Sequence, residues 1–195
     1  GFISRVKTSK YRFNPQSRIS LATALLAFVL SGGFIFYNTN ILNDYSNPDD
    51  TEARQVEYEK QYKKYDGIPQ PRIVDVFAEV DFYPQARDVD IRGRYLLVNK
   101  TGVAIDSVHV RQPVIGDLKL KMNDLTVGDS ERVFADTSLG HYIYRLATPL
   151  QPADTITMTF DYHWRTRGFV NNNSNTSVVY NGSFINNATA FPHIG

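Results

Sequence analysis

The stretch 72–98, RIVDVFAEVDFYPQARDVDIRGRYLLV, alternates apolar and polar residues in two runs that a short proline-containing turn separates. Each run therefore has one apolar face, as a half-buried strand does. These two faces comprise Val74, Val76, Ala78, Val80 and Phe82, then Val89, Ile91, Gly93, Tyr95 and Leu97. The pattern predicts a β-hairpin, and the glycine inside its second strand predicts a bulge.

The same period of two recurs downstream in the segments AIDSVHV, GDLKLKM, ERVFA, HYIYRLA and DTITMTFDYHWRT. In the last of them every second residue, from Ile156 to Trp164, is apolar and is expected to face inward. Six to eight short strands without a helical period between them predict a mainly β fold, an antiparallel β-saddle or β-sandwich over residues 72–168. Residues 169–195 are rich in asparagine, which favours turns, and they predict a loop leading to a following domain.

Before the β region, residues 19–40 predict a transmembrane helix. Between Ile19 and Asn43 the only ionisable side chain is that of Tyr37. The apolar part would form a helix about 28 Å long, close to the thickness of the hydrocarbon core. A buried core helix and a signal peptide are the alternatives, but the run ends in aromatic residues instead of a small-residue cleavage site.

The charges on either side of this run predict its orientation. Residues 1–18 contain five basic residues and no acid, whereas acids follow the run from Asp44 onward. The positive-inside rule therefore predicts a cytoplasmic basic arm over 1–18, in contact with the lipid bilayer, and places the residues after about 40 outside. The small residues Ser31, Gly32 and Gly33 would let another helix approach closely. No feature indicates nucleic acid, and the chain's ends at Gly1 and Gly195 suggest a segment of a longer protein.

Residues 41–71 read as a linker with a helix over about 48–66. Asn47 can cap it, Pro48 suits its first position and Gly67 can end it. A stripe of aromatic residues lies on one face at spacings of four and three residues: Tyr58, Tyr62 and Tyr65. We expect the stripe to pack on the following domain, with a docking face for a partner subunit as the alternative.

The segment contains no set of residues that predicts catalysis. It has no cysteine, which excludes disulfides and thiolate metal sites, and its four histidines are far apart in the sequence. We therefore predict no catalytic, cofactor-binding or metal-binding residues here. His109 and His163 are expected on sheet faces, and His193, in the terminal loop, is the one candidate functional residue.

Three strings in this order resemble one family: YEKQYKKYDGIPQPRIVDVFAEVDFYPQARDVDIRGRYLLVNKTG, YRLATPLQPADTITMTFDY and NGSFINNATAFPHIG. They are similar to bacterial membrane proteins in which an ABC-type permease region is fused to an aminopeptidase N-like zinc metallopeptidase. The resemblance covers the last permease span, the linker helix and the N-terminal β-saddle domain of the peptidase. One strand of that domain carries a Pro-Gly-Asp turn, and this chain departs from it at Ala153.

This resemblance implies an anchored β-domain that shapes or positions a peptidase cleft outside the bacterial inner membrane. Zinc, its ligands and the peptide substrate would belong to a downstream peptidase domain, so the segment alone should be inactive. Other permease helices and that domain are the implied partners. The alternatives are a non-enzymatic periplasmic binding or assembly module of a transporter, and an adhesin-like anchored sandwich.

Overall fold

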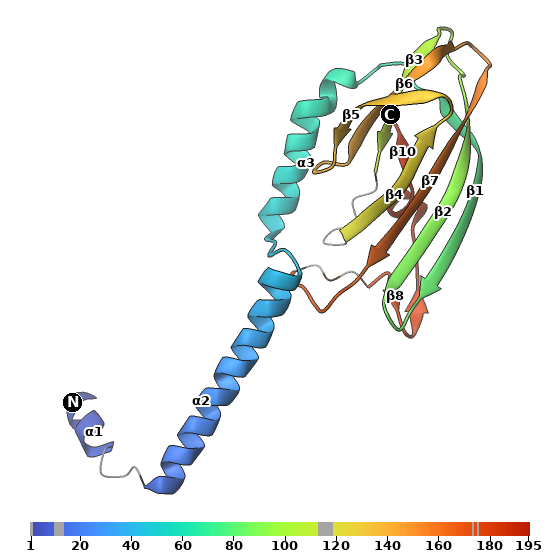
Figure 1. The fold of residues 1–195 in the computed structure, drawn as a ribbon. Helices are drawn as coiled ribbons and strands as arrows, with labels where there is room; N and C mark the ends of the chain where they lie inside the picture. Colours follow the sequence, from blue (N-terminus) through green and yellow to red (C-terminus); the bar gives the residue numbers. More distant parts are fainter. Residues whose placement is uncertain (1, 10–13, 113–118, 173, 175) are drawn as a thin grey trace. The chain divides into compact units, whose positions relative to one another are not determined.

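The computed structural model describes residues 2–9, 14–112, 119–172, 174 and 176–195. The chain divides into two compact units, 1–45 and 46–195, and each is described by itself. The first consists of helices, and the second of one long helix and the strands (Figure 1). The chain as a whole is therefore mixed α/β, with more residues in strands than in helices.

The first unit is dominated by an apolar helix of 28 residues. After α1 (Phe2–Ser9), α2 runs over Pro15–Phe36 and continues as the π-helical segment η2, Tyr37–Leu42. It begins before the predicted residue 19 because Asn14 caps it, with its Oδ1 accepting a hydrogen bond from the Ser17 N–H at 2.7 Å. By length and composition it has the properties of a membrane anchor or of a signal sequence.

Polar side chains mark the end of the apolar helix. The Asn38 amide donates to the Phe34 carbonyl at 2.8 Å, and the Thr39 hydroxyl donates to the Ile35 carbonyl at 3.0 Å. Such bonds compete with the regular backbone ladder, and a π-helical turn is one way in which a helix accommodates them. The helical segment closes at Leu42, and Asn43 has an extended backbone.

The second unit begins with α3 (Pro48–Tyr62) and the 3-10 turn η3 (Lys63–Tyr65), which together form the expected linker helix. The Asp50 carboxylate accepts a hydrogen bond from the Asn47 N–H at 2.6 Å, which satisfies a donor just before the first turn. Gly67 has a φ of +81°, a conformation that glycine adopts without steric cost and that ends the helix.

Two antiparallel four-stranded sheets form the body of this unit. The first has the order β1-β2-β7-β4, and the second has the order β10-β3-β6-β5. Their strands are β1 (Arg72–Tyr83), β2 (Asp88–Val98), β3 (Ile105–Arg111), β4 (Lys119–Val127), β5 (Ser130–Asp136), β6 (His141–Leu150), β7 (Thr155–Arg165) and β10 (His193–Ile194). The predicted antiparallel β region and its first hairpin are confirmed. The first three residues of the predicted strand GDLKLKM, 116–118, lie outside the described residues.

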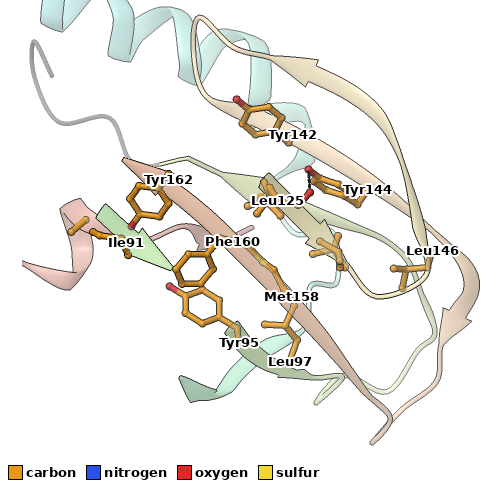
Figure 2. Packing of buried hydrophobic residues seen from close by; sticks show 14 of the residues in the cluster. Ile91, Tyr95, Leu97, Leu125, Tyr142, Tyr144, Leu146, Met158, Phe160 and Tyr162 are labelled. Atoms are coloured by element: carbon orange, nitrogen blue, oxygen red, sulfur yellow. Dashed lines mark hydrogen bonds between the residues drawn. The ribbon is translucent and has the colours of Figure 1, made fainter. Parts of the chain in front are cut away.

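The hydrophobic core lies between the sheets, where side chains of β2 and β7 meet those of β6 (Figure 2). The Tyr144 hydroxyl of β6 donates to the Leu125 carbonyl of β4 at 3.0 Å and so joins the two sheets. The predicted inward faces of β2 and β7 are buried except at Gly93 and Ile156, which are partly buried, and Met158 and Tyr162 are fully inaccessible. The predicted face of β1 is different: Val76 is 55% and Phe82 41% exposed, and β1 is an edge strand that pairs only with β2 in the described structure.

The predicted bulge at Gly93 was wrong. The register runs without a shift through Ala78, Gly93 and Phe160, three residues directly opposite one another on β1, β2 and β7. A Cβ at position 93 would lie 2.5 Å from the Phe160 ring and 2.7 Å from the Phe77 carbonyl oxygen. The glycine therefore makes room for an aromatic ring in a regular strand.

The asparagine-rich segment 169–195 folds back onto the sheets and belongs to the second unit. It contains β8 (Val178–Val179), β9 (Gly182–Ser183), α4 (Asn187–Ala190) and β10. Phe191 packs against the core, and the Tyr95 hydroxyl donates to the Pro192 carbonyl at 3.2 Å. The segment is therefore an integral part of the β unit.

Candidate functional site

The linker helix contacts the second sheet through a cluster that we name the tyrosine–histidine clamp: Tyr58, Tyr62, Tyr65, His109, Asp136 and His141. The tyrosines come from α3 and η3, His109 from β3, Asp136 from the end of β5 and His141 from the start of β6. Figure 1 shows α3 beside β5. The stripe therefore packs on the chain's own β unit, as expected.

The two histidines are buried next to each other. His141 is 2% and His109 5% exposed, and His141 Nε2 lies 3.3 Å from His109 Nδ1, within hydrogen-bond distance. On the other side of its ring, His141 Nδ1 lies 3.1 Å from the Tyr58 hydroxyl. Both ring nitrogens of His141 therefore have partners, one of them on the linker helix.

Tyr62 is the most deeply buried residue of the linker helix. Its ring stacks on the His141 ring with centroids 4.1 Å apart and planes inclined by 15°. Its hydroxyl donates to Asp136 Oδ2 at 2.5 Å. The other carboxylate oxygen of Asp136 accepts hydrogen bonds from the Ser138 and Leu139 backbone N–H groups at 2.9 and 3.0 Å. A single side chain thus provides stacking and a charge-assisted hydrogen bond across the contact.

Burial and hydrogen bonding shift the titration of the clamp. Burial lowers the pKa of His109 and, with repulsion from His109, lowers the pKa of His141 to about 4. Burial would raise the pKa of Asp136, but the hydrogen bonds from Ser138, Tyr62 and the backbone outweigh it and hold that pKa at about 2. Burial and the Asp136 contact raise the pKa of Tyr62. At neutral pH the cluster therefore holds two neutral imidazoles, the neutral phenols of Tyr58 and Tyr62, and an ionised carboxylate.

A pocket of about 510 Å³ lies over the clamp. The clamp tyrosines and histidines line it together with charged residues of both signs, among them Arg111 and Lys63 with Glu59 and Asp66. The Arg111 guanidinium lies over the Tyr58 ring, 5.3 Å from its centroid. This composition provides aromatic contacts and hydrogen-bonding groups.

Metal binding has little support in this cluster. No group of three or more histidine, cysteine, aspartate or glutamate side chains among the described residues could hold a metal ion. The two clamp histidines alone fall short of the three protein ligands of a catalytic zinc site.

Gln70 hydrogen-bonds the end of the linker to the second sheet. Its Oε1 accepts a hydrogen bond from the His109 N–H at 2.8 Å, and its Nε2 donates to the Ser107 carbonyl at 3.1 Å. The segment between Gly67 and β1 is therefore bound to the backbone of β3. The clamp and Gln70 together hold both the helix and its connection against one sheet.

Sequence reasoning located the tyrosines but missed the histidine pair. His141 lies opposite Arg111 in the β3–β6 register, which makes it the diagonal neighbour of His109 on the same face of the sheet. The two are 32 positions apart, and only the strand pairing brings them together. The one signal of this pair in the sequence was that two predicted strands, AIDSVHV and HYIYRLA, each contain a histidine.

The other histidines lie elsewhere. His193, the candidate functional residue, is on β10, opposite Arg111 of β3, and is partly buried. His163 is on β7 of the first sheet, as predicted for a sheet-face residue, opposite Asp90 and Lys121. Neither belongs to the clamp.

The chain matches no protein-family model, no curated protein and no solved structure.

Proposed function

We propose that residues 1–195 are the membrane-anchored N-terminal part of a zinc aminopeptidase-like protein fused to a permease. In this proposal α2 is the last permease span, and the β unit positions a downstream peptidase domain outside the bacterial inner membrane. The β unit has a structural role and supplies no catalytic group. Zinc would be bound by residues of the downstream domain.

The observation that carries this proposal is the docked linker helix. A flexible tether would leave its side chains in water, whereas Tyr62 is buried against His141 and bonded to Asp136. A helix fixed in this way cannot turn freely relative to the sheets of its own unit, residues 46–195. Such a restriction is useful to a module whose task is to orient a neighbouring domain.

The backbone at position 153 gives further support. The resembling family usually has glycine there, and Ala153 has a φ of +70°, in the left-handed region that glycine adopts readily. The Ala153 N–H donates to the Asn99 carbonyl at 2.8 Å, so this conformation is held by the turn after β2. If this chain and the family share the turn, position 153 should have a left-handed backbone, which glycine adopts readily and which Ala153 has.

The proposal is tested on the full-length parent protein, purified in detergent. We expect it to bind zinc and to release amino-terminal residues from peptides, and we expect a chelator to abolish that activity. Residues 1–195 prepared in the same detergent are the matched control and should bind no zinc stoichiometrically. A parent with neither zinc nor activity would favour the binding or assembly module, and stoichiometric zinc in residues 1–195 would contradict the proposal.

A further inference from the structure

The linker helix depends on three side chains for its contact with the β unit. Among the described side chains of residues 48–69, all are exposed except those of Tyr58, Tyr62 and Tyr65. Two of these three touch His141 directly: Tyr58 through its hydroxyl and Tyr62 through its ring. The edge of the Tyr65 ring meets His109, with centroids 4.7 Å apart. The histidine pair is thus the surface on which the helix is docked.

The geometry of that pair restricts its charge. Two imidazole nitrogens 3.3 Å apart can share one proton in a hydrogen bond, but a proton on both would place two donors and two positive charges face to face. The Arg111 guanidinium lies over the Tyr58 ring and is close enough to His141 to lower its pKa, so it adds a third positive charge to the cluster. We propose that the tyrosine–histidine clamp is an acid-sensitive latch, which holds α3 on the sheets while His109 and His141 are neutral and releases it when they are protonated.

The other charged groups around the pair do not cancel this effect. From the second sheet the histidines face Arg111 of β3 and Asp136 of β5, and from the linker they face the three clamp tyrosines. Glu59, Lys63 and Asp66 lie at the pocket wall and bring both signs of charge. Asp136 is the one acid that favours protonation of His141, and burial together with repulsion from His109 and Arg111 outweighs it.

The direction of the pH dependence follows from the two states of the helix. In the released state the imidazoles are in water and titrate near pH 6.5, whereas in the docked state the pKa of His141 is about 4. Well above pH 6.5 both states are neutral, and docking has its full strength. As the pH falls below 6.5 the released state binds protons that the docked state does not, so docking weakens by up to tenfold for each pH unit through His141, until about pH 4. His109, whose pKa is also lowered, adds to this loss. In the docked state the carboxyl of Asp136 stays ionised over this range, because its pKa is about 2.

Hydrogen exchange of the whole 195-residue chain in detergent micelles tests this latch. A released helix of this length frays in water, so its amide protection factors report the docked fraction. We expect protection factors in α3, corrected for intrinsic exchange, to fall by about 15-fold between pH 6.5 and pH 5.0 from the titration of His141 alone. Amides of β7 in the core should stay protected and serve as the internal control.

Two variants separate the latch from a general acid effect. The double variant His109→Phe with His141→Phe keeps aromatic rings at both positions and should make α3 protection independent of pH over this range. His163→Phe, on the other sheet, should behave as the wild type. An unchanged α3 protection in the wild-type chain, an equal loss in β7, or the same pH response in the double variant would overturn the proposal.

If α3 of the double variant does not dock even at pH 6.5, titration of His141 in the wild-type chain tests the latch instead. The ring protons of His141 in the wild-type chain, followed by NMR, should then give an apparent pKa below 6.5. A value of 6.5 or above would overturn the latch, because protonation would no longer oppose docking.

Discussion

Asn99 and Ala153 close neighbouring turns at one end of the first sheet. The Asn99 side chain is 1% exposed, and its amide donates to the Val103 and Leu150 carbonyls, both at 2.8 Å. Its backbone carbonyl accepts the bond from Ala153, and its N–H donates to the Asp154 carbonyl at 3.0 Å. The Asn99 Oδ1 accepts hydrogen bonds from the Thr101 N–H and hydroxyl, so all polar groups of this buried residue are used inside the fold.

Ala153→Gly should stabilise the β unit. The alanine has a φ of +70°, where its Cβ is crowded, and glycine relieves that strain at the cost of a more flexible unfolded chain. We expect a net gain of about 0.5–1 kcal/mol in the free energy of unfolding. Urea denaturation followed by the fluorescence of Trp164, the only tryptophan, measures it.

Ala86→Gly provides the matched control for this substitution. Ala86 lies in the turn between β1 and β2 and has no positive φ. Glycine there relieves no strain and should leave stability unchanged or lower it. A loss of stability in the Ala153 variant equal to that of the control would show that the strain at position 153 is not relieved.

At the scale of single residues, the sequence predicts side chains whose role is set locally. The caps Asn47 and Pro48 and the helix end at Gly67 follow from their own backbone chemistry, and the structure contains each of them. The His109–His141 pair depends on a strand register that spans 32 positions and that local patterns do not specify. Histidine spacing along the chain was therefore a poor guide to histidine spacing in the fold.

At the scale of elements, β2 shows how a small residue serves a regular strand. Gly93 faces the Phe160 ring across the β2–β7 ladder, and a methyl group there would have to displace both that ring and the β1 backbone. Gly93→Ala should therefore cost about 1–3 kcal/mol of unfolding free energy. The same urea denaturation measures the loss.

Gly102→Ala is the control for that substitution. A Cβ at position 102 would have no neighbouring atom within 4 Å, and Gly102 has no positive φ, so its replacement should change the stability by less than about 0.5 kcal/mol. Equal effects of the two substitutions would show that the contact with Phe160 does not limit position 93.

Period-two alternation predicted the main strands, but it did not predict which apolar faces would be covered: β4, the other edge strand of the first sheet, has Leu125 and Val127 buried. β2 and β7 have neighbours on both sides, and their apolar faces are covered. β1 has the same alternation but stands at an edge, where Val76 remains 55% exposed. Strand order is set by the whole topology, so the sequence of one strand could not reveal that difference.

At the scale of the whole molecule, the chain joins an apolar helix of 28 residues to a β unit with its own core. The composition of the helix was readable from the sequence because it depends on a contiguous run. The packing of α3 on the β unit was expected from its tyrosine stripe, and Tyr62 makes that contact with Asp136. The inclusion of residues 169–195 in the β unit was not readable, because it depends on contacts across the chain, such as Asn171 with Ser46.

The central claim, an anchored chain whose β unit lies outside the cytoplasm, is tested most directly by thiol labelling of intact bacterial cells. The chain has no cysteine, so Tyr180→Cys, at a position that is 79% exposed, and Ser4→Cys in the basic arm each introduce a single reactive group. With a maleimide that does not cross the cytoplasmic membrane, we predict labelling at position 180 in intact cells and at position 4 only after the cells are opened. Labelling at position 4 but not at position 180 in intact cells would contradict the account.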